Sequence, residues 1–208
     1  MSVGRDAFQR AANVSRETLE RLGIYEALLM KWTRRINLVS PATLASLWNR
    51  HFLDSAQLME FAPRASERWV DLGSGGGFPG AVIAILSCEA APERRVTLIE
   101  SDQRKATFLR AISRETGVSF HVVTDRIEAA PPMQADIVSA RALAPLPDLL
   151  SLVARHLKPT GKALLMKGAG HADEVVNALE RWRFDCETHR SKTDAEAVIL
   201  EIGEIERV

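Results

Sequence analysis

A glycine-rich segment at residues 69–80, WVDLGSGGGFPG, carries the residues best suited to bind a nucleotide-like ligand. Small residues between a strand and a helix let the backbone come close to a ligand, and the helix N-terminus offers unpaired N–H groups. Two interpretations compete. Gly75, Gly77 and Gly80 fit the dinucleotide fingerprint G-x-G-x-x-G. In contrast, Gly73, Gly75 and Gly77, directly after an apolar run, suit a methyl donor.

The neighbouring residues favour the methyl donor S-adenosylmethionine. In the dinucleotide fold the first glycine follows the strand at once, which selects Gly73 and requires a third glycine where this chain has Phe78. Asp71 ends an apolar strand, where its carboxylate can hold the cationic amino-acid end of the donor directly or through water, but would repel a pyrophosphate. Glu100 ends the next apolar run, where a carboxylate can bind ribose hydroxyls of either cofactor class.

Other nucleotide chemistries fit less well. A short-chain dehydrogenase needs Tyr-x-x-x-Lys, but the only tyrosine, Tyr25, is followed four residues later by Leu29 and precedes the glycine loop. A P-loop is excluded because Gly161-Lys162 is followed by Ala163, with no glycine-rich approach.

The secondary structure that must position these residues is expected to change near Pro63, from helices to alternating strands and helices. Before it, Leu28, Leu29, Trp32 and Ile36 recur at helical spacing. After it, apolar runs alternate with helix-like segments, which is typical of an α/β fold with a mostly parallel sheet. We expect strands at residues 68–72, 95–100, 119–124, 135–141, 161–168, 185–190 and 197–203, and helices at 78–87, 102–117, 146–158 and 171–182.

These elements predict a Rossmann-like, mostly parallel, seven-stranded sheet. The last two strands follow one another without a helix, so one of them should enter antiparallel. We expect an N-terminal helical extension at residues 1–62 and a nucleotide-binding domain at residues 63–208.

Composition is that of an ordinary globular protein, with 46% hydrophobic and 26% charged residues. The two cysteines, Cys88 and Cys186, lie far apart and predict neither a disulfide framework nor a zinc site. Net charge is zero, but residues 171–208 contain 10 acidic and 5 basic residues, which leaves the first 170 residues basic. The N-terminus has no apolar signal segment and no later run could span a membrane, so we expect a cytoplasmic protein with no membrane partner. We also expect a monomer with no metal.

Seven segments together resemble the RsmG (GidB) family of bacterial small-subunit rRNA methyltransferases, and the match covers nearly the whole chain. They are RRINLVS, RHFLDS, VDLGSGGGFPG, LIESDQRKATFLR, DRIE, VSARALAPL and LLMKG. The resemblance implies a class I methyltransferase fold. It also implies transfer of a methyl group from S-adenosylmethionine to N7 of a specific guanine in 16S rRNA, within the small ribosomal subunit or an assembly precursor.

The resemblance also implies roles for single residues. Gly73 and Phe78 would line the cofactor in the loop, and Glu100 would bind the ribose. We expect Asp71 at the end of the strand, and Gly75 and Gly77 in the loop, to bind the cofactor as well. Ile127 and Glu128 would flank the adenine, although the family more often has Arg-Ala-Glu at residues 126–128. Arg141 would lie near both the cofactor and the transfer site.

Methylation of guanine N7 requires few catalytic groups from the protein. Exocyclic-amine methyltransferases commonly carry Asn/Asp-Pro-Pro-Tyr/Phe after the fourth strand, where this chain reads SARALAPL. Pyrimidine-C5 enzymes use a cysteine nucleophile, and neither cysteine lies in such a motif. N7 already holds a lone pair and carries no proton, so no general base is needed. Alignment and exclusion of water then suffice.

Basic residues are the remaining candidates. Arg141 and Lys167 are expected at the C-terminal ends of adjacent strands, and one or both would hold a phosphate or the guanine O6. His51, Asp54 and Ser55 share a helical face, and we favour a structural hydrogen-bond cluster there over a catalytic dyad. Candidate RNA contacts are Lys31, Arg34, Arg35, Arg50, Arg104 and Lys105.

Two rival functions remain open at this point. The first is a small-molecule methyltransferase on the same fold, for which the zero net charge is an argument. The second is a non-catalytic cofactor-binding protein that acts in ribosome assembly.

Overall fold

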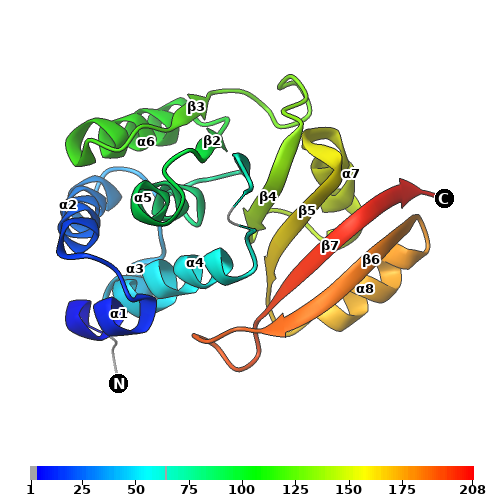
Figure 1. Ribbon diagram of the computed structural model, residues 1–208, viewed down its shortest axis with the longest axis horizontal. Coiled ribbons are helices and arrows are strands. Elements are labelled where there is room, and N and C mark those ends of the chain that lie inside the picture. The colour runs from blue at the N-terminus through cyan, green and yellow to red at the C-terminus, as the bar shows by residue number, and fades with distance from the viewer. Residues whose placement is uncertain (1–3, 64) are drawn as a thin grey trace.

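The computed structural model describes residues 4–63 and 65–208, and its centre is a seven-stranded sheet (Figure 1). The strand order is β3-β2-β1-β4-β5-β7-β6. The strands are β1 Arg68–Leu72, β2 Arg95–Ile99, β3 His121–Val123, β4 Ala135–Arg141, β5 Leu157–Lys167, β6 Trp182–Arg190 and β7 Val198–Arg207. β7 runs antiparallel to both of its neighbours, β5 and β6, whereas the pairs among β1 to β5 are parallel. The predicted sheet and its single reversed strand are confirmed.

Helices cover both faces of this sheet (Figure 1). In the N-terminal part they are α1 Arg5–Ala12, α2 Arg16–Thr33, α3 Pro41–Leu44, the π-helical turn η1 Trp48–Leu53, α4 Asp54–Ala56 and the 3-10 turn η2 Gln57–Glu60. The sheet region adds α5 Gly80–Ala90, α6 Gln103–Thr116, α7 Leu146–His156 and α8 His171–Leu179. In the described part of the chain, none of these helices is long and apolar enough to cross a membrane.

Two strands begin earlier than the sequence predicted. β5 starts at Leu157 instead of Gly161, because Leu157 already pairs with Ala135 before the register shifts between Ala135 and Ile137. β6 starts at Trp182 instead of Asp185, and Trp182 pairs with Arg207. Pairing with a neighbouring strand thus extends both elements towards the N-terminus of the predicted segment.

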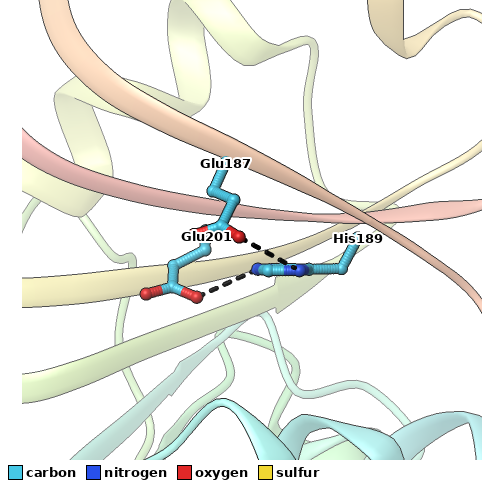
Figure 2. A group of neighbouring side chains, drawn as sticks. All are labelled: Glu187, His189 and Glu201. Carbon is cyan, nitrogen blue, oxygen red and sulfur yellow. Dashed lines mark hydrogen bonds and ion pairs between the residues drawn. The ribbon is translucent and has the colours of Figure 1, made fainter.

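A charged cluster spans the antiparallel end of the sheet (Figure 2). The His189 ring lies between Glu201, 3.0 Å from its Nε2, and Glu187, 3.8 Å from its Nδ1. Lys162 on β5 also forms an ion pair with Glu201, and Phe61 stacks on the His189 ring at 4.2 Å. Glu187, His189 and Glu201 carry oxygen and nitrogen atoms of the kinds that bind metal ions. Across the strands, Lys162 balances the charge of Glu201, and His189 is joined to the same carboxylate by a hydrogen bond.

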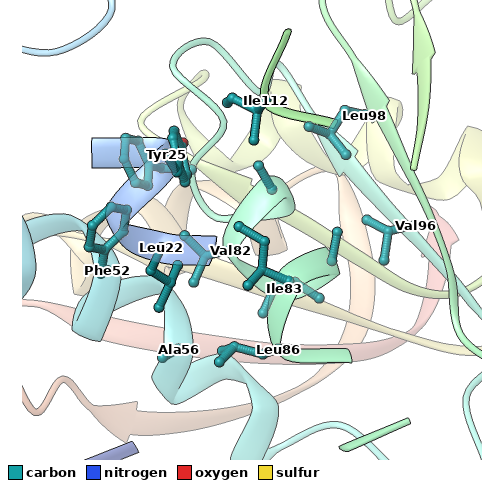
Figure 3. Packing of buried hydrophobic residues seen from close by; sticks show 14 of the residues in the cluster. Leu22, Tyr25, Phe52, Ala56, Val82, Ile83, Leu86, Val96, Leu98 and Ile112 are labelled. Atoms are coloured by element: carbon teal, nitrogen blue, oxygen red, sulfur yellow. The ribbon is translucent and has the colours of Figure 1, made fainter. Parts of the chain in front are cut away.

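The N-terminal helices share their core with the sheet region (Figure 3). Leu22, Tyr25 and Phe52 lie in one buried cluster with Val82 and Ile83 of α5. A second cluster fills the opposite face beneath α7 and α8. The expected N-terminal helices are therefore present, and they form a layer over α5 and α6. The boundary between residues 62 and 63 stays a prediction.

Candidate functional site

The glycine loop connects β1 to α5 and has the backbone shape that only glycine adopts easily. Gly73, Gly75 and Gly77 have φ values of 65°, 56° and 92°. The Gly75 N–H donates to Oε2 of Glu100 at 2.8 Å, and the Asp102 N–H donates to Oε1 of the same carboxylate at 2.8 Å. The predicted ribose-binding carboxylate thus lies directly at the loop, and each of its oxygens keeps a further lone pair.

Tyr25 supports the loop from α2. Its hydroxyl donates to the Gly76 carbonyl, and its ring stacks on Phe78 with centroids 5.3 Å apart. A Cβ atom on Gly77 would collide with the Tyr25 hydroxyl, so glycine is required there. Tyr25 was not predicted to take part in the site, since no local pattern links it to a loop about fifty residues away.

Asp71 lies behind the loop. Its side chain is fully buried, and its two oxygens accept from the Ser139 hydroxyl at 2.7 Å and from the Gly80 N–H at 3.1 Å. A Cβ atom on Gly80 would come within 2.7 Å of Asp71, so this close approach also requires glycine. Asp71 therefore ties β1 to the start of α5 and to β4.

Burial gives Asp71 an unusual titration. Loss of solvation raises the pKa of this carboxyl from 3.8 to about 6, although the hydrogen bonds partly oppose the rise. Between these two values the folded protein holds a proton that the unfolded chain has released. Stability from this group is therefore lost as the pH rises through that interval.

We predict that Asp71→Asn, which cannot ionise, removes this pH dependence. The unfolding free energy of the variant, minus that of wild type, should rise by roughly 2 kcal/mol between pH 4 and pH 7, since one pKa unit is worth about 1.36 kcal/mol and the unfolded carboxyl is already partly ionised at pH 4. Urea unfolding of both proteins across this range measures the difference. A difference that stays constant with pH would show that Asp71 titrates normally.

The predicted adenine-flanking residues lie in the turn after β3. The Ile127 carbonyl contacts His156 Nε2 at 2.9 Å, and its half-buried side chain packs against the second core cluster. Glu128 is exposed. Their contact with adenine stays a prediction.

Arg141 ends β4 beside the loop and is the centre of a polar cluster. Its Nη2 lies 3.0 Å from His51 Nδ1, and its Nη1 lies 3.6 Å from Asp54 Oδ2. The guanidinium also lies over the Phe78 ring, 5.0 Å from the ring centroid. The structure thus joins His51 and Asp54 to Arg141. The buried Ser55 hydroxyl has no partner among the described residues.

A cavity of about 540 Å³ opens next to Arg141. Residues 142–145 after β4 line one side, and the hairpin at residues 191–197 lines another. Lys167 also borders it, but its ammonium binds the Ala144 carbonyl and Glu174, each at 2.7 Å. Glu174 in turn accepts from the Leu146 N–H at 2.7 Å. Lys167 therefore holds the segment after β4 in place, and its predicted contact with substrate stays a prediction.

The hairpin between β6 and β7 was not predicted to reach the site. Thr193 donates to Asp54, Arg50 forms an ion pair with Asp194 at 2.7 Å, and the Lys192 N–H donates to Gln57 at 2.9 Å. These contacts join residues more than 130 positions apart, for which the sequence carries no local signal.

Comparison with known proteins agrees with the family resemblance of the sequence segments. The family model GidB, rRNA small subunit methyltransferase G, matches residues 18–199. A Ribosomal RNA small subunit methyltransferase G from Ruegeria sp. (strain TM1040) is 50% identical over 208 residues and covers 100% of both chains.

Two solved structures share the fold. One is a TehB-like SAM-dependent methyltransferase from Corynebacterium glutamicum, with a TM-score of 0.59, 16% identity and coverage of 86% of this chain and 98% of the other. The other is a mutant of MtNAS in complex with S-adenosylmethionine, with a TM-score of 0.60, 15% identity and coverage of 97% and 84%. The predicted class I fold is confirmed.

Proposed function

The chain belongs to the rRNA small subunit methyltransferase G family, and from this premise we propose that it methylates N7 of a guanine in 16S rRNA with S-adenosylmethionine as donor. Its substrate would be the small ribosomal subunit or an assembly precursor, and it would act in the cytoplasm.

We place the donor over the glycine loop. The backbone of Gly73, Gly75 and Gly77 lines the donor, with open space next to Gly75, and Glu100 accepts hydrogen bonds from the ribose hydroxyls. Phe78 contributes through its backbone, since its ring is 3% exposed and lies under Arg141. Asp71 acts through the loop that it fixes, and Ile127 and Glu128 border the adenine.

The methyl acceptor occupies the cavity on the other side of Arg141. This arginine borders both the cavity and the buried Phe78 of the donor loop, so it can orient the guanine O6 or a phosphate beside the donor. Lys167 keeps the adjoining segment in position. When bound, S-adenosylmethionine supplies an electrophilic methyl group on a sulfonium.

The choice of N7 rests on one observation about the cavity: its ionisable side chains are already engaged. Asp54 accepts from Thr193 and Gln57. Glu174 binds Lys167, and Asp194 binds Arg50. The His51 ring contacts Arg141 at one nitrogen and Thr43 at the other. This arrangement suits an acceptor that needs no general base, because its nitrogen attacks with an existing lone pair.

The test compares methyl acceptors. Purified protein is incubated with isotope-labelled S-adenosylmethionine and either small ribosomal subunits lacking the modification, protein-free 16S rRNA, or guanine nucleotides. We expect label in the rRNA of the subunits and none in the nucleotides. Label in the nucleotides alone would favour a small-molecule methyltransferase. Binding of donor with no transfer to any acceptor would favour a non-catalytic role in assembly.

A further inference from the structure

A chain of hydrogen bonds reaches Arg141 from the N-terminal helices. Arg141 Nη2 lies 3.0 Å from His51 Nδ1, His51 Nε2 lies 2.8 Å from the Thr43 hydroxyl, and this hydroxyl donates to the Ser40 carbonyl at 2.8 Å. Thr43 comes from α3 and His51 from η1, whereas Arg141 ends β4. Residues remote in sequence thus fix the position of the arginine.

The chemistry of the partners gives each bond a single direction. A guanidinium has only N–H donors, so His51 Nδ1 must accept and carries no proton. The proton of the neutral ring is therefore on Nε2, which donates to Thr43. Thr43 can accept this bond because its own hydroxyl hydrogen points to Ser40. The network selects one tautomer of one protonation state.

We propose that His51 is a positioning residue that holds the Arg141 guanidinium in place for the methyl acceptor through its neutral Nε2–H tautomer. This inference rests on the proposed function, in which Arg141 contacts the acceptor. It assigns His51 no proton transfer, since its only lone pair in the ring plane is directed to Arg141.

The surroundings of His51 keep the ring neutral and in place. The residue is 8% exposed, and its ring packs on Phe78 with centroids 4.8 Å apart. Burial, followed by the positive charges of Arg141 and Arg50, lowers the pKa of His51 from 6.5 to about 3. A charged imidazolium could not accept from Arg141 and would repel it. The same Phe78 ring lies under both side chains.

Two substitutions distinguish the roles of the two ring nitrogens of His51. In His51→Asn the amide oxygen takes the place of Nδ1, so the acceptor for Arg141 remains while the contact with Thr43 is lost. In His51→Gln the longer amide reaches the place of Nε2, so the contact with Thr43 remains while the acceptor for Arg141 is lost. Both variants lose the ring, so their thermal unfolding temperatures should fall by similar amounts.

The readout is steady-state methylation of small subunits, with donor affinity measured separately. We expect His51→Gln to have a kcat/KM for subunits about tenfold below that of His51→Asn, because a hydrogen bond to a charged group is lost only in the former. Donor affinity should be equal in the two. Equal kcat/KM values, or a lower value for His51→Asn, would overturn the proposal.

The ring itself gives a readout that does not depend on activity. Nitrogen NMR of ¹⁵N-histidine-labelled wild-type protein should show a neutral His51 ring with its proton on Nε2, and Thr43→Val should perturb this signal while Thr43→Ser preserves it. A proton on Nδ1 would refute the proposal even if the enzyme is active. The expected tautomer in a protein that methylates no subunit would instead point to failure of the proposed function.

Discussion

Replacing Arg141 by alanine is expected to lower kcat/KM for small ribosomal subunits on the order of a thousandfold, as when a donor that orients or stabilises the transition state is removed. The guanidinium borders the acceptor cavity, and it contacts His51, Asp54 and Phe78, together with the Arg50 carbonyl. The proposed donor contacts come from the backbone of the glycine loop and from Glu100. Loss of the guanidinium should therefore leave the affinity for S-adenosylmethionine within about threefold of wild type. Initial-rate kinetics and calorimetric donor binding measure the two effects.

Two variants sharpen this prediction. Arg141→Lys keeps the charge but loses the planar set of donors, so most of the activity should still be lost. Lys167→Met should lower the unfolding temperature more and activity less than Arg141→Ala, because it breaks the ion pair with Glu174 that holds the segment after β4. If Lys167→Met lost more turnover while its fold remained intact, the two cations would have to exchange roles.

The second large effect is expected at Gly75. An alanine there would find open space in the protein, with the nearest atom, the Gly73 carbonyl oxygen, 3.8 Å away. Its positive φ of 56° should cost about 1 kcal/mol of stability. If the donor lies against this backbone, the added methyl group should weaken donor binding on the order of a hundredfold. Equilibrium binding of S-adenosylmethionine tests this.

Gly117 supplies the matched control. It has a similar φ of 68°, and a Cβ atom added to it would meet nothing within 4 Å, but it ends α6, away from the loop. Gly117→Ala should therefore lose about the same stability as Gly75→Ala and keep donor affinity. Equal donor affinities in the two variants would mean that the donor does not approach Gly75.

Patterns of neighbouring residues correctly predicted the strands of the sheet and the glycine loop. The alternation of apolar runs and helical segments indicated the seven strands, and the glycines after β1 indicated the loop because their positive φ values leave a sequence signature. The starts of β5 and β6 were misplaced because Leu157 pairs with Ala135 and Trp182 with Arg207, and such pairing between distant residues leaves no local signal.

The candidate site was predictable only in part, because contacts between residues distant in sequence leave no local signal. Asp71, Glu100 and Arg141 were selected because each lies at or near the end of a predicted strand, and the structure brings all three to the glycine loop, while their roles stay predictions. Tyr25 and Thr193 were missed, since they reach the site across about 50 and 140 residues of sequence. Ser139 offered a usable signal, because a polar residue within the buried strand ADIVSAR needs a buried partner, and that partner is Asp71.

The identity of the methylated nucleoside tests the central claim most directly. Small ribosomal subunits that lack the modification are incubated with the protein and isotope-labelled S-adenosylmethionine, and the digested 16S rRNA is analysed by mass spectrometry. We predict label in 7-methylguanosine at a single position. Label in a guanine methylated on a ring or exocyclic nitrogen other than N7, or in a pyrimidine, would contradict the account, because those acceptors need a free base or a nucleophile.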